Sequence, residues 1–187
     1  MAAESWKTIL CLGDSLTEGF GVADAQCYPR LLQQRLRLQG SAIRVVNAGI
    51  SGDTTQGVLE RLDDLLTTPV DLAIVTIGLN DVFMGYPATI IQDNLETIVQ
   101  TLQRHPSRVV LSGLRLPSDF PQPIRHEFAA LYPRLAAKYH LDLIPFFCEN
   151  IFEDRAYNQW DNVHPNAAGY RVILETVWKI VQPLLPR

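Results

Sequence analysis

The segment Thr8-Ile9-Leu10-Cys11-Leu12-Gly13-Asp14-Ser15 carries the clearest sign of how this 187-residue chain folds. A short and mostly apolar run is followed at once by Gly, Asp and Ser. Such a run is typical of a strand that is buried on both faces, which is the environment of strands in a parallel sheet. The Gly-Asp-Ser sequence is typical of a turn into a helix, since Asp and Ser cap helix starts well.

Four further apolar runs resemble the first, with amphipathic segments between them. The expected strands are Thr8–Leu12, Ile43–Asn47, Leu72–Ile77, Val109–Leu114 and Leu141–Phe146. Helical spacing of apolar residues predicts helices over Tyr28–Gln39, Thr89–Arg104, Arg125–Tyr139 and the segment that follows Asn166. Strand–helix alternation predicts an α/β fold with a parallel five-stranded sheet and helices on both faces. The length predicts a single domain over residues 1–187.

Composition excludes several classes of protein. Sixteen Lys and Arg residues against 20 Asp and Glu residues give a net charge of −4, which argues against a nucleic-acid or anionic-membrane binder. The three cysteines form no Cys-x-x-Cys pair, so neither a disulfide scaffold nor a cysteine zinc site is expected. No apolar run approaches the roughly 18 residues of a membrane span. A monomer is the default expectation for the oligomeric state.

The beginning of the chain bears on its location. Residues Met1 to Thr8 lack the basic and apolar regions of a signal peptide. A cytoplasmic location is therefore expected for the chain as given. A periplasmic or secreted location is the alternative if a leader has been removed.

Residues that follow the expected strands are the candidates for a functional site, because ligands bind at the carboxyl ends of the strands in open α/β sheets. Ser15 follows the first strand. Asp161 and His164 lie three residues apart on an expected turn before the last helix. In that arrangement the carboxylate accepts a hydrogen bond from His Nδ1 and leaves Nε2 free as a base. With Ser15 as the nucleophile, the three residues make a hydrolytic triad.

Three hydrogen-bond donors are expected at the same rim. Ser15 offers its own backbone N–H, Gly52 offers a backbone N–H with no side chain in the way, and Asn80 offers a side-chain amide. Donors from three strand ends can stabilise the oxyanion of a tetrahedral intermediate. The pattern therefore favours acyl transfer through a serine nucleophile.

Each of these features also has an ordinary structural interpretation. Gly-Asp-Ser is a common strand-to-helix turn, and Asp161 with His164 could be a metal pair or a solvated turn. The main rival function is a Mg-dependent phospho-receiver or phosphohydrolase that uses Asp14, Asp53 and Asp81. A non-catalytic ligand-binding module is a third alternative. The hydrolase interpretation is preferred because it alone gives a role to every member of the set.

Four blocks of the chain carry a resemblance to a known family. They are Gly13-Asp14-Ser15-Leu16, Gly52, Gly78-Leu79-Asn80-Asp81 and Asp161-Asn162-Val163-His164-Pro165. Together they resemble the SGNH, or GDSL-type, hydrolase superfamily, and the likeness spans Leu10 to Asn166. The segments 47–54, 115–117 and 143–147 are similar to the bacterial multifunctional thioesterase/lysophospholipase/arylesterase subgroup. The chain departs from the subgroup at Leu79, where many members have Gly. The width of the acyl groove therefore does not follow from the resemblance.

The resemblance implies a three-layer α/β/α sandwich of the flavodoxin-like type. It implies Ser15 as nucleophile, His164 as base and Asp161 as its partner, with Gly52 and Asn80 joining the Ser15 amide in the oxyanion hole. The expected activity is the hydrolysis of acyl, aryl or short-to-medium-chain esters, acyl thioesters or lysophospholipids through an acyl-enzyme. No cofactor and no metal is expected, and the expected partner is a small acyl ester.

The substrate-binding residues are expected in two apolar segments. Val82, Phe83 and Met84 follow Asn80 closely, and their apolar side chains show neither strand nor helix periodicity. We expect them to face Leu116 and Pro117 and to form a wall over the acyl group. The alternative is that Phe83 simply covers the edge of the sheet.

Overall fold

A computed structural model of the protein describes residues 6–105 and 107–186. A parallel sheet lies at its centre, with the strand order β2-β1-β3-β4-β5. The strands are β1 (Thr8–Gly13), β2 (Arg44–Gly49), β3 (Leu72–Thr76), β4 (Arg108–Ser112) and β5 (Asp142–Ile144). This order is that of flavodoxin-like folds, in which the direction of winding reverses between β1 and β3. The expected five-stranded parallel sheet is confirmed.

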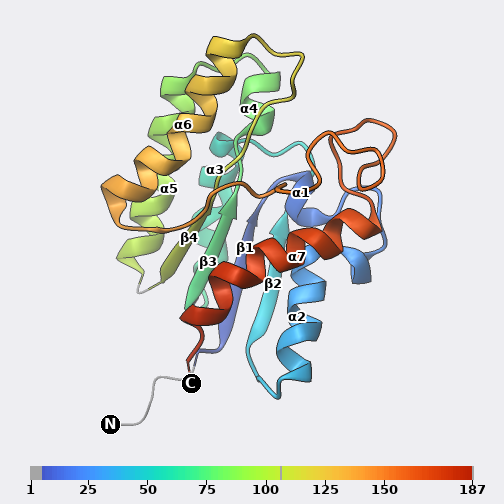
Figure 1. Ribbon diagram of the computed structural model, residues 1–187. Coiled ribbons are helices and arrows are strands. Elements are labelled where there is room, and N and C mark those ends of the chain that lie inside the picture. Colours follow the sequence, from blue (N-terminus) through green and yellow to red (C-terminus); the bar gives the residue numbers. More distant parts are fainter. Residues whose placement is uncertain (1–5, 106, 187) are drawn as a thin grey trace.

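Long helices cover both faces of the sheet (Figure 1). One face carries α2 (Tyr28–Leu38) and α7 (Ala167–Val181), and the other carries α3 (Thr55–Leu65), α5 (Ala88–Arg104) and α6 (Gln122–Tyr139). Two short helices, α1 (Ser15–Glu18) and α4 (Leu79–Phe83), follow β1 and β3 directly. The 3-10 turns are η1 (Asp24–Gln26) and η2 (Gln182–Leu184). The result is the expected α/β/α sandwich.

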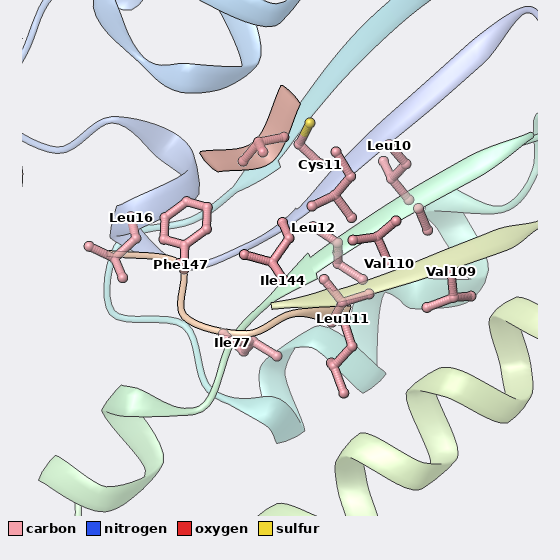
Figure 2. Packing of buried hydrophobic residues seen from close by; sticks show 14 of the residues in the cluster. Leu10, Cys11, Leu12, Leu16, Ile77, Val109, Val110, Leu111, Ile144 and Phe147 are labelled. Carbon is pink, nitrogen blue, oxygen red and sulfur yellow. The ribbon is translucent and has the colours of Figure 1, made fainter. Parts of the chain in front are cut away.

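The core lies between the sheet and its helices. Every residue of β1 and of β3 is buried, which explains why these strands read as continuous apolar runs rather than as an alternating pattern. Figure 2 shows side chains from several strands packed together, among them Leu12 of β1, Val110 of β4 and Ile144 of β5. The packed strands give a rigid base from which the loops at their carboxyl ends project.

The elements differ from the sequence expectations in three places. Helix α3 was not among the expected helices, although Val58 and Leu62 are buried at helical spacing and Thr54 caps its start by accepting from the Gly57 N–H. Helix α4 includes Val82 and Phe83, a segment that was expected to be irregular. Strand β5 ends at Ile144 because the next residue, a proline, has no N–H to donate to the ladder.

The helix that closes the fold begins as expected. The Asn166 side chain caps α7 by accepting hydrogen bonds from the backbone N–H groups of Ala168 and Gly169. This cap also fixes the end of the loop that contains Asp161 and His164. Within the described residues, no helix has both the length and the apolar character needed to cross a membrane.

Candidate active site

Ser15 lies at the junction of β1 and α1. Asp14 is the N-cap of α1 and accepts a hydrogen bond from the Leu16 N–H at 3.0 Å, so Ser15 becomes the first helical residue. The turn is tight at Gly13, where a Cβ atom would lie 2.3 Å from both the Thr17 hydroxyl and the Thr76 carbonyl. A glycine is therefore required there. The Ser15 residue is 8% exposed and lies at the carboxyl-end rim of the sheet.

A line of hydrogen bonds joins Ser15 to the loop before α7. The Ser15 Oγ atom lies 2.9 Å from His164 Nε2, and His164 Nδ1 lies 2.7 Å from Asp161 Oδ2. The other carboxylate oxygen of Asp161 accepts from the backbone N–H groups of Val163 and His164, both at 3.0 Å. The ring of Phe20 contacts the imidazole, with 4.7 Å between the ring centroids. The imidazole is thus held on three sides.

The Asp161 carboxylate is kept charged by its neighbours. Partial burial acts to raise its pKa, but the hydrogen bonds from the His164 backbone, the His164 ring and the Val163 N–H outweigh that effect. The pKa of Asp161 is therefore lowered from its ordinary value. A charged Asp161 fixes the proton of a neutral imidazole on Nδ1 and leaves Nε2 as the acceptor for the Ser15 hydroxyl proton.

The three expected donors follow β1, β2 and β3 at the carboxyl-end rim of the sheet. Gly52 has φ +81°, which suits glycine, and a Cβ atom added there would have open space around it. The backbone N–H groups of Ser15 and Gly52 have no acceptor among the described residues. Asn80 donates from Nδ2 to the Asp53 carbonyl at 2.8 Å, which orients the amide and leaves its second hydrogen available.

The three carboxylates that the phosphohydrolase interpretation would use already interact with other groups of the protein. Asp53 pairs with Arg61 at 2.7 Å, and Asp81 accepts from the Thr55 N–H and hydroxyl. Burial raises the pKa of Asp14 to about 7; the Leu16 N–H opposes that shift and the charge of Asp53 adds to it. The described part of the chain contains no group of three or more His, Cys, Asp or Glu residues arranged to hold a metal ion.

A small, mostly apolar pocket is lined by Leu16 and Val163, the chain neighbours of Ser15 and His164. Its volume is about 30 Å³, and on this measure a single water occupies roughly 10 to 15 Å³. The lining residues are Leu16, Leu79, Phe83, Leu114, Arg115, Pro117, Phe146, Cys148, Phe152, Glu153, Asn158, Asn162 and Val163. The pocket has room for a short acyl group.

The five expected substrate-binding residues do not lie together. Phe83 and Pro117 line the pocket, but Val82 lines a separate apolar hollow under the loop before α5. Met84 is 61% exposed and lines neither space. Leu116 does not face the acyl group as expected: its side chain is 1% exposed and belongs to the core cluster, while its neighbours Arg115 and Pro117 face the pocket.

Sequence reasoning connected Leu79 with the width of the acyl groove, but it did not assign Phe146 or Cys148 to substrate binding. Leu79 directly precedes Asn80, so it was placed at the rim by the same rule that found the donor. Phe146 and Cys148 follow β5, and the rule that sites lie at the carboxyl ends of strands would have found them if it had been applied to the fifth strand. Their apolar character made them look like core residues.

Comparisons with known proteins find relatives over nearly the whole chain. A sequence profile of the GDSL-like lipase/acylhydrolase family matches residues 11–172. Esterase TesA of Pseudomonas aeruginosa is 36% identical over 180 residues, which cover 96% of this chain and 90% of TesA. Thioesterase 1/protease 1/lysophospholipase L1 of Escherichia coli is 34% identical over 184 residues, which cover 98% of this chain and 87% of that protein.

Solved structures show the same likeness. A crystal structure of TesA superposes with a TM-score of 0.92 at 36% identity, covering 96% of this chain and all of that one. Esterase EstA of Pseudoalteromonas, in a form inhibited by monoethylphosphonate, superposes with a TM-score of 0.89 at 27% identity, covering 95% of this chain and 98% of that one.

Proposed function

The chain belongs to the GDSL-like lipase/acylhydrolase family and is a carboxylic ester hydrolase, and from that premise we propose that Ser15 is its nucleophile. His164 is then the general base. Asp161 orients the imidazole and stabilises the positive charge that it gains with the proton. The oxyanion hole consists of the Ser15 N–H, the Gly52 N–H and the Asn80 amide. The observation that carries the proposal is the unbroken line of hydrogen bonds from Ser15 Oγ through His164 to Asp161.

Acylation follows from this arrangement. The Ser15 oxygen attacks the ester carbonyl carbon while its proton passes to His164 Nε2. Charge develops on the carbonyl oxygen, and the three donors stabilise it. The tetrahedral intermediate collapses when the C–O bond to the alcohol breaks, and His164 gives its proton to the leaving alkoxide. The acyl group remains on Ser15 as an ester.

Deacylation repeats the same steps with water as the nucleophile. His164 takes a proton from a water molecule, which attacks the acyl carbonyl. The second tetrahedral intermediate breaks the bond to Ser15 Oγ, and His164 returns the proton to the serine. The products are the free acid and the regenerated enzyme. Every role is filled by a side chain or a backbone amide, so we expect activity to persist after exhaustive treatment with EDTA.

The pocket supports short acyl groups as the substrate class. Leu79 and Phe83, which lie on the same short helix as Asn80, line it, and its volume of about 30 Å³ leaves room for only a few atoms. Apolar walls bind the methyl or methylene groups of an acyl chain, at up to about 0.8 kcal/mol per buried methylene. Short-chain carboxylic esters and the corresponding thioesters are therefore the proposed substrates.

Substitution of Ser15 tests the proposal. Ser15→Ala removes one hydroxyl, and alanine fits the first turn of α1, so the fold should survive. We expect kcat on p-nitrophenyl acetate and butyrate to fall on the order of 10⁵-fold. Ser41→Ala is the matched control, because Ser41 precedes β2 at the opposite end of the sheet. A folded Ser15→Ala protein that keeps wild-type turnover would exclude Ser15 as the nucleophile.

A further inference from the structure

Glu18 has a contact that the triad and the oxyanion donors do not explain. It is the last residue of α1, three residues after Ser15. Its carboxylate oxygen Oε2 accepts a hydrogen bond from the Ser51 backbone N–H at 2.8 Å and a second from the Ser51 hydroxyl. Ser51 directly precedes Gly52. A side chain on the nucleophile's own helix is therefore bonded to the residue beside an oxyanion donor.

Gly52 lies in a turn that needs such support. The Asp53 N–H donates to the Ile50 carbonyl at 3.1 Å, and Gly52 has φ +81° at the third position. This is the pattern of a type II turn, in which the third residue requires positive φ. The turn itself leaves the Gly52 N–H unpaired among the described residues, so its direction depends on how the neighbouring residues are held.

The far side of the turn is held by a partly buried network of hydrogen bonds. Arg61 donates to the Asp53 carboxylate at 2.7 Å and to the Gly13 carbonyl at 3.2 Å, and Asn80 donates to the Asp53 carbonyl. These bonds link the turn to β1 and to α4. They fix Asp53 but leave the near side of the turn, at Ser51, to another group.

Glu18 supplies the bond on the near side. It is itself fixed, because Asn47 on β2 donates from Nδ2 to the Glu18 carbonyl at 3.1 Å. The strand and the helix also meet closely, since a Cβ atom at Gly49 would lie 2.1 Å from the Glu18 backbone nitrogen. Glu18 is exposed on its outer side, so it is not part of the core.

We propose that Glu18 is a positioning residue of the oxyanion hole, which acts by holding Ser51 and thereby aiming the Gly52 N–H at the oxyanion. The inference rests on the proposed function of Ser15 and Gly52. A donor that is held in place before the reaction stabilises the transition state more than one that must be ordered during it. Loss of the Glu18 bond therefore lowers kcat and leaves ground-state binding of the ester unchanged.

The first experiment compares kcat and KM for wild type, Glu18→Ala and Glu18→Gln. Glu18→Ala should lower kcat about tenfold with KM within twofold of wild type, because one of three oxyanion donors loses its fixed direction. Glu18→Gln keeps an oxygen that accepts from the Ser51 N–H and should restore most of kcat. Glu60→Ala is the matched control, since this exposed glutamate of α3 has Gln56 as its one side-chain partner among the described residues.

A second variant approaches the contact from its other partner. Ser51→Ala removes the hydroxyl but keeps the N–H bond, so we expect a kcat loss of about threefold. In the Glu18→Ala background, Ser51→Ala should add no further loss, because the shared contact is already gone. If Glu18→Ala failed to fold, Ser51→Ala alone would carry the test.

Several results would overturn the inference. Unchanged kcat in both Glu18→Ala and Ser51→Ala would show that the turn holds Gly52 unaided. A rise in KM alone would place Glu18 in substrate binding. A Glu18→Gln variant as slow as Glu18→Ala would mean that the negative charge of Glu18, and not its hydrogen bond to Ser51, supports kcat. Titration of wild type with an organophosphonate separates the two proposals: stoichiometric labelling on Ser15 with no Glu18 effect rejects only this inference, and no labelling rejects the proposed function beneath it.

Discussion

The catalytic corner and the acyl wall lie at the same rim of the sheet but are built in different ways. We use catalytic corner for Ser15, Gly52, Asn80, Asp161 and His164, and acyl wall for the pocket-lining residues Leu79, Phe83, Pro117 and Phe146. In the corner, hydrogen bonds of 2.7 to 2.9 Å fix the Ser15, His164, Asp161 and Asn80 side chains. In the wall, the contacts are apolar, such as the one between the Phe83 and Phe120 rings, whose centroids lie 5.7 Å apart.

The difference shows what determines each property of the enzyme. Hydrogen bonds are directional, so the Ser15, His164, Asp161 and Asn80 side chains have one geometry in which each has a partner. Apolar packing is not directional, so a hydrophobic side chain at the rim can face the pocket, the core or solvent. We therefore expect the corner to determine the chemistry, and the wall to determine substrate size in a way that substitutions can change gradually.

The largest effect is expected within the corner. Asn80→Ala removes one oxyanion donor and the bond to the Asp53 carbonyl. We expect kcat to fall by about 10² to 10³, with a much smaller change in KM. Steady-state kinetics on one short-chain ester checks this prediction. An increase in KM without loss of kcat would move Asn80 from the corner to the wall.

A smaller effect is expected at Asp14, where ionisation changes the free energy of unfolding rather than the rate of catalysis. Asp14 is 1% exposed, and its Oδ2 atom has no hydrogen-bond partner among the described residues. Burial raises its pKa from 3.8 to about 7. Between those two values the native state keeps the proton that the unfolded state has lost. Stability therefore falls as pH rises through this window, by up to about 1.4 kcal/mol per pH unit from this group.

Asp14→Asn should remove that contribution, because an amide does not titrate and still accepts from the Leu16 N–H. Urea unfolding of both proteins at several pH values between about 4 and 7 checks the prediction. The variant should gain stability relative to wild type as the pH rises. Parallel curves for the two proteins would mean that Asp14 ionises normally in the native state. No acyl-wall substitution should have this pH dependence.

The smallest effect is expected at the acyl wall. Phe83 lines the pocket, Phe120 lines the neighbouring hollow of about 360 Å³, and their contact separates the two spaces. Phe83→Ala should shift the optimum of kcat/KM to longer acyl chains, by at most about fourfold per added methylene. Turnover of acetate esters should stay nearly intact.

A series of p-nitrophenyl esters from acetate to octanoate measures this shift. Met84→Ala is the control, since Met84 is exposed and lines neither space. An equal loss on every ester in Phe83→Ala, with the chain-length profile unchanged, would mean that Phe83 only supports the fold.

The same contrast explains what could be predicted from the sequence. All five strands were predicted to within a few residues, because runs buried on both faces are continuous and apolar. The corner residues were proposed from the sequence because the types of side chain at strand ends limit their possible roles, and the structure joins Ser15, His164 and Asp161 by hydrogen bonds. Helix α3 was missed although Val58 and Leu62 carry its stripe, since Gly57 and a start at two threonines weaken the helical pattern.

The acyl wall was predicted less well for a physical reason. Leu116 and Pro117 are adjacent and both apolar, yet one belongs to the core and the other faces the pocket. Composition alone does not say which way such side chains turn, because burial in the core and burial against a substrate favour the same residue types. Orientation at the wall is decided by packing, which only the three-dimensional structure reveals.

The nucleophile is tested most directly by locating a covalent adduct. Wild type and Ser15→Ala are each treated with an ethyl p-nitrophenyl phosphonate, digested and mapped by tandem mass spectrometry. The account predicts one phosphonyl group per wild-type chain, attached to Ser15, with complete loss of esterase activity, and no adduct in Ser15→Ala. An adduct on any other residue, or full labelling that leaves activity intact, would contradict it.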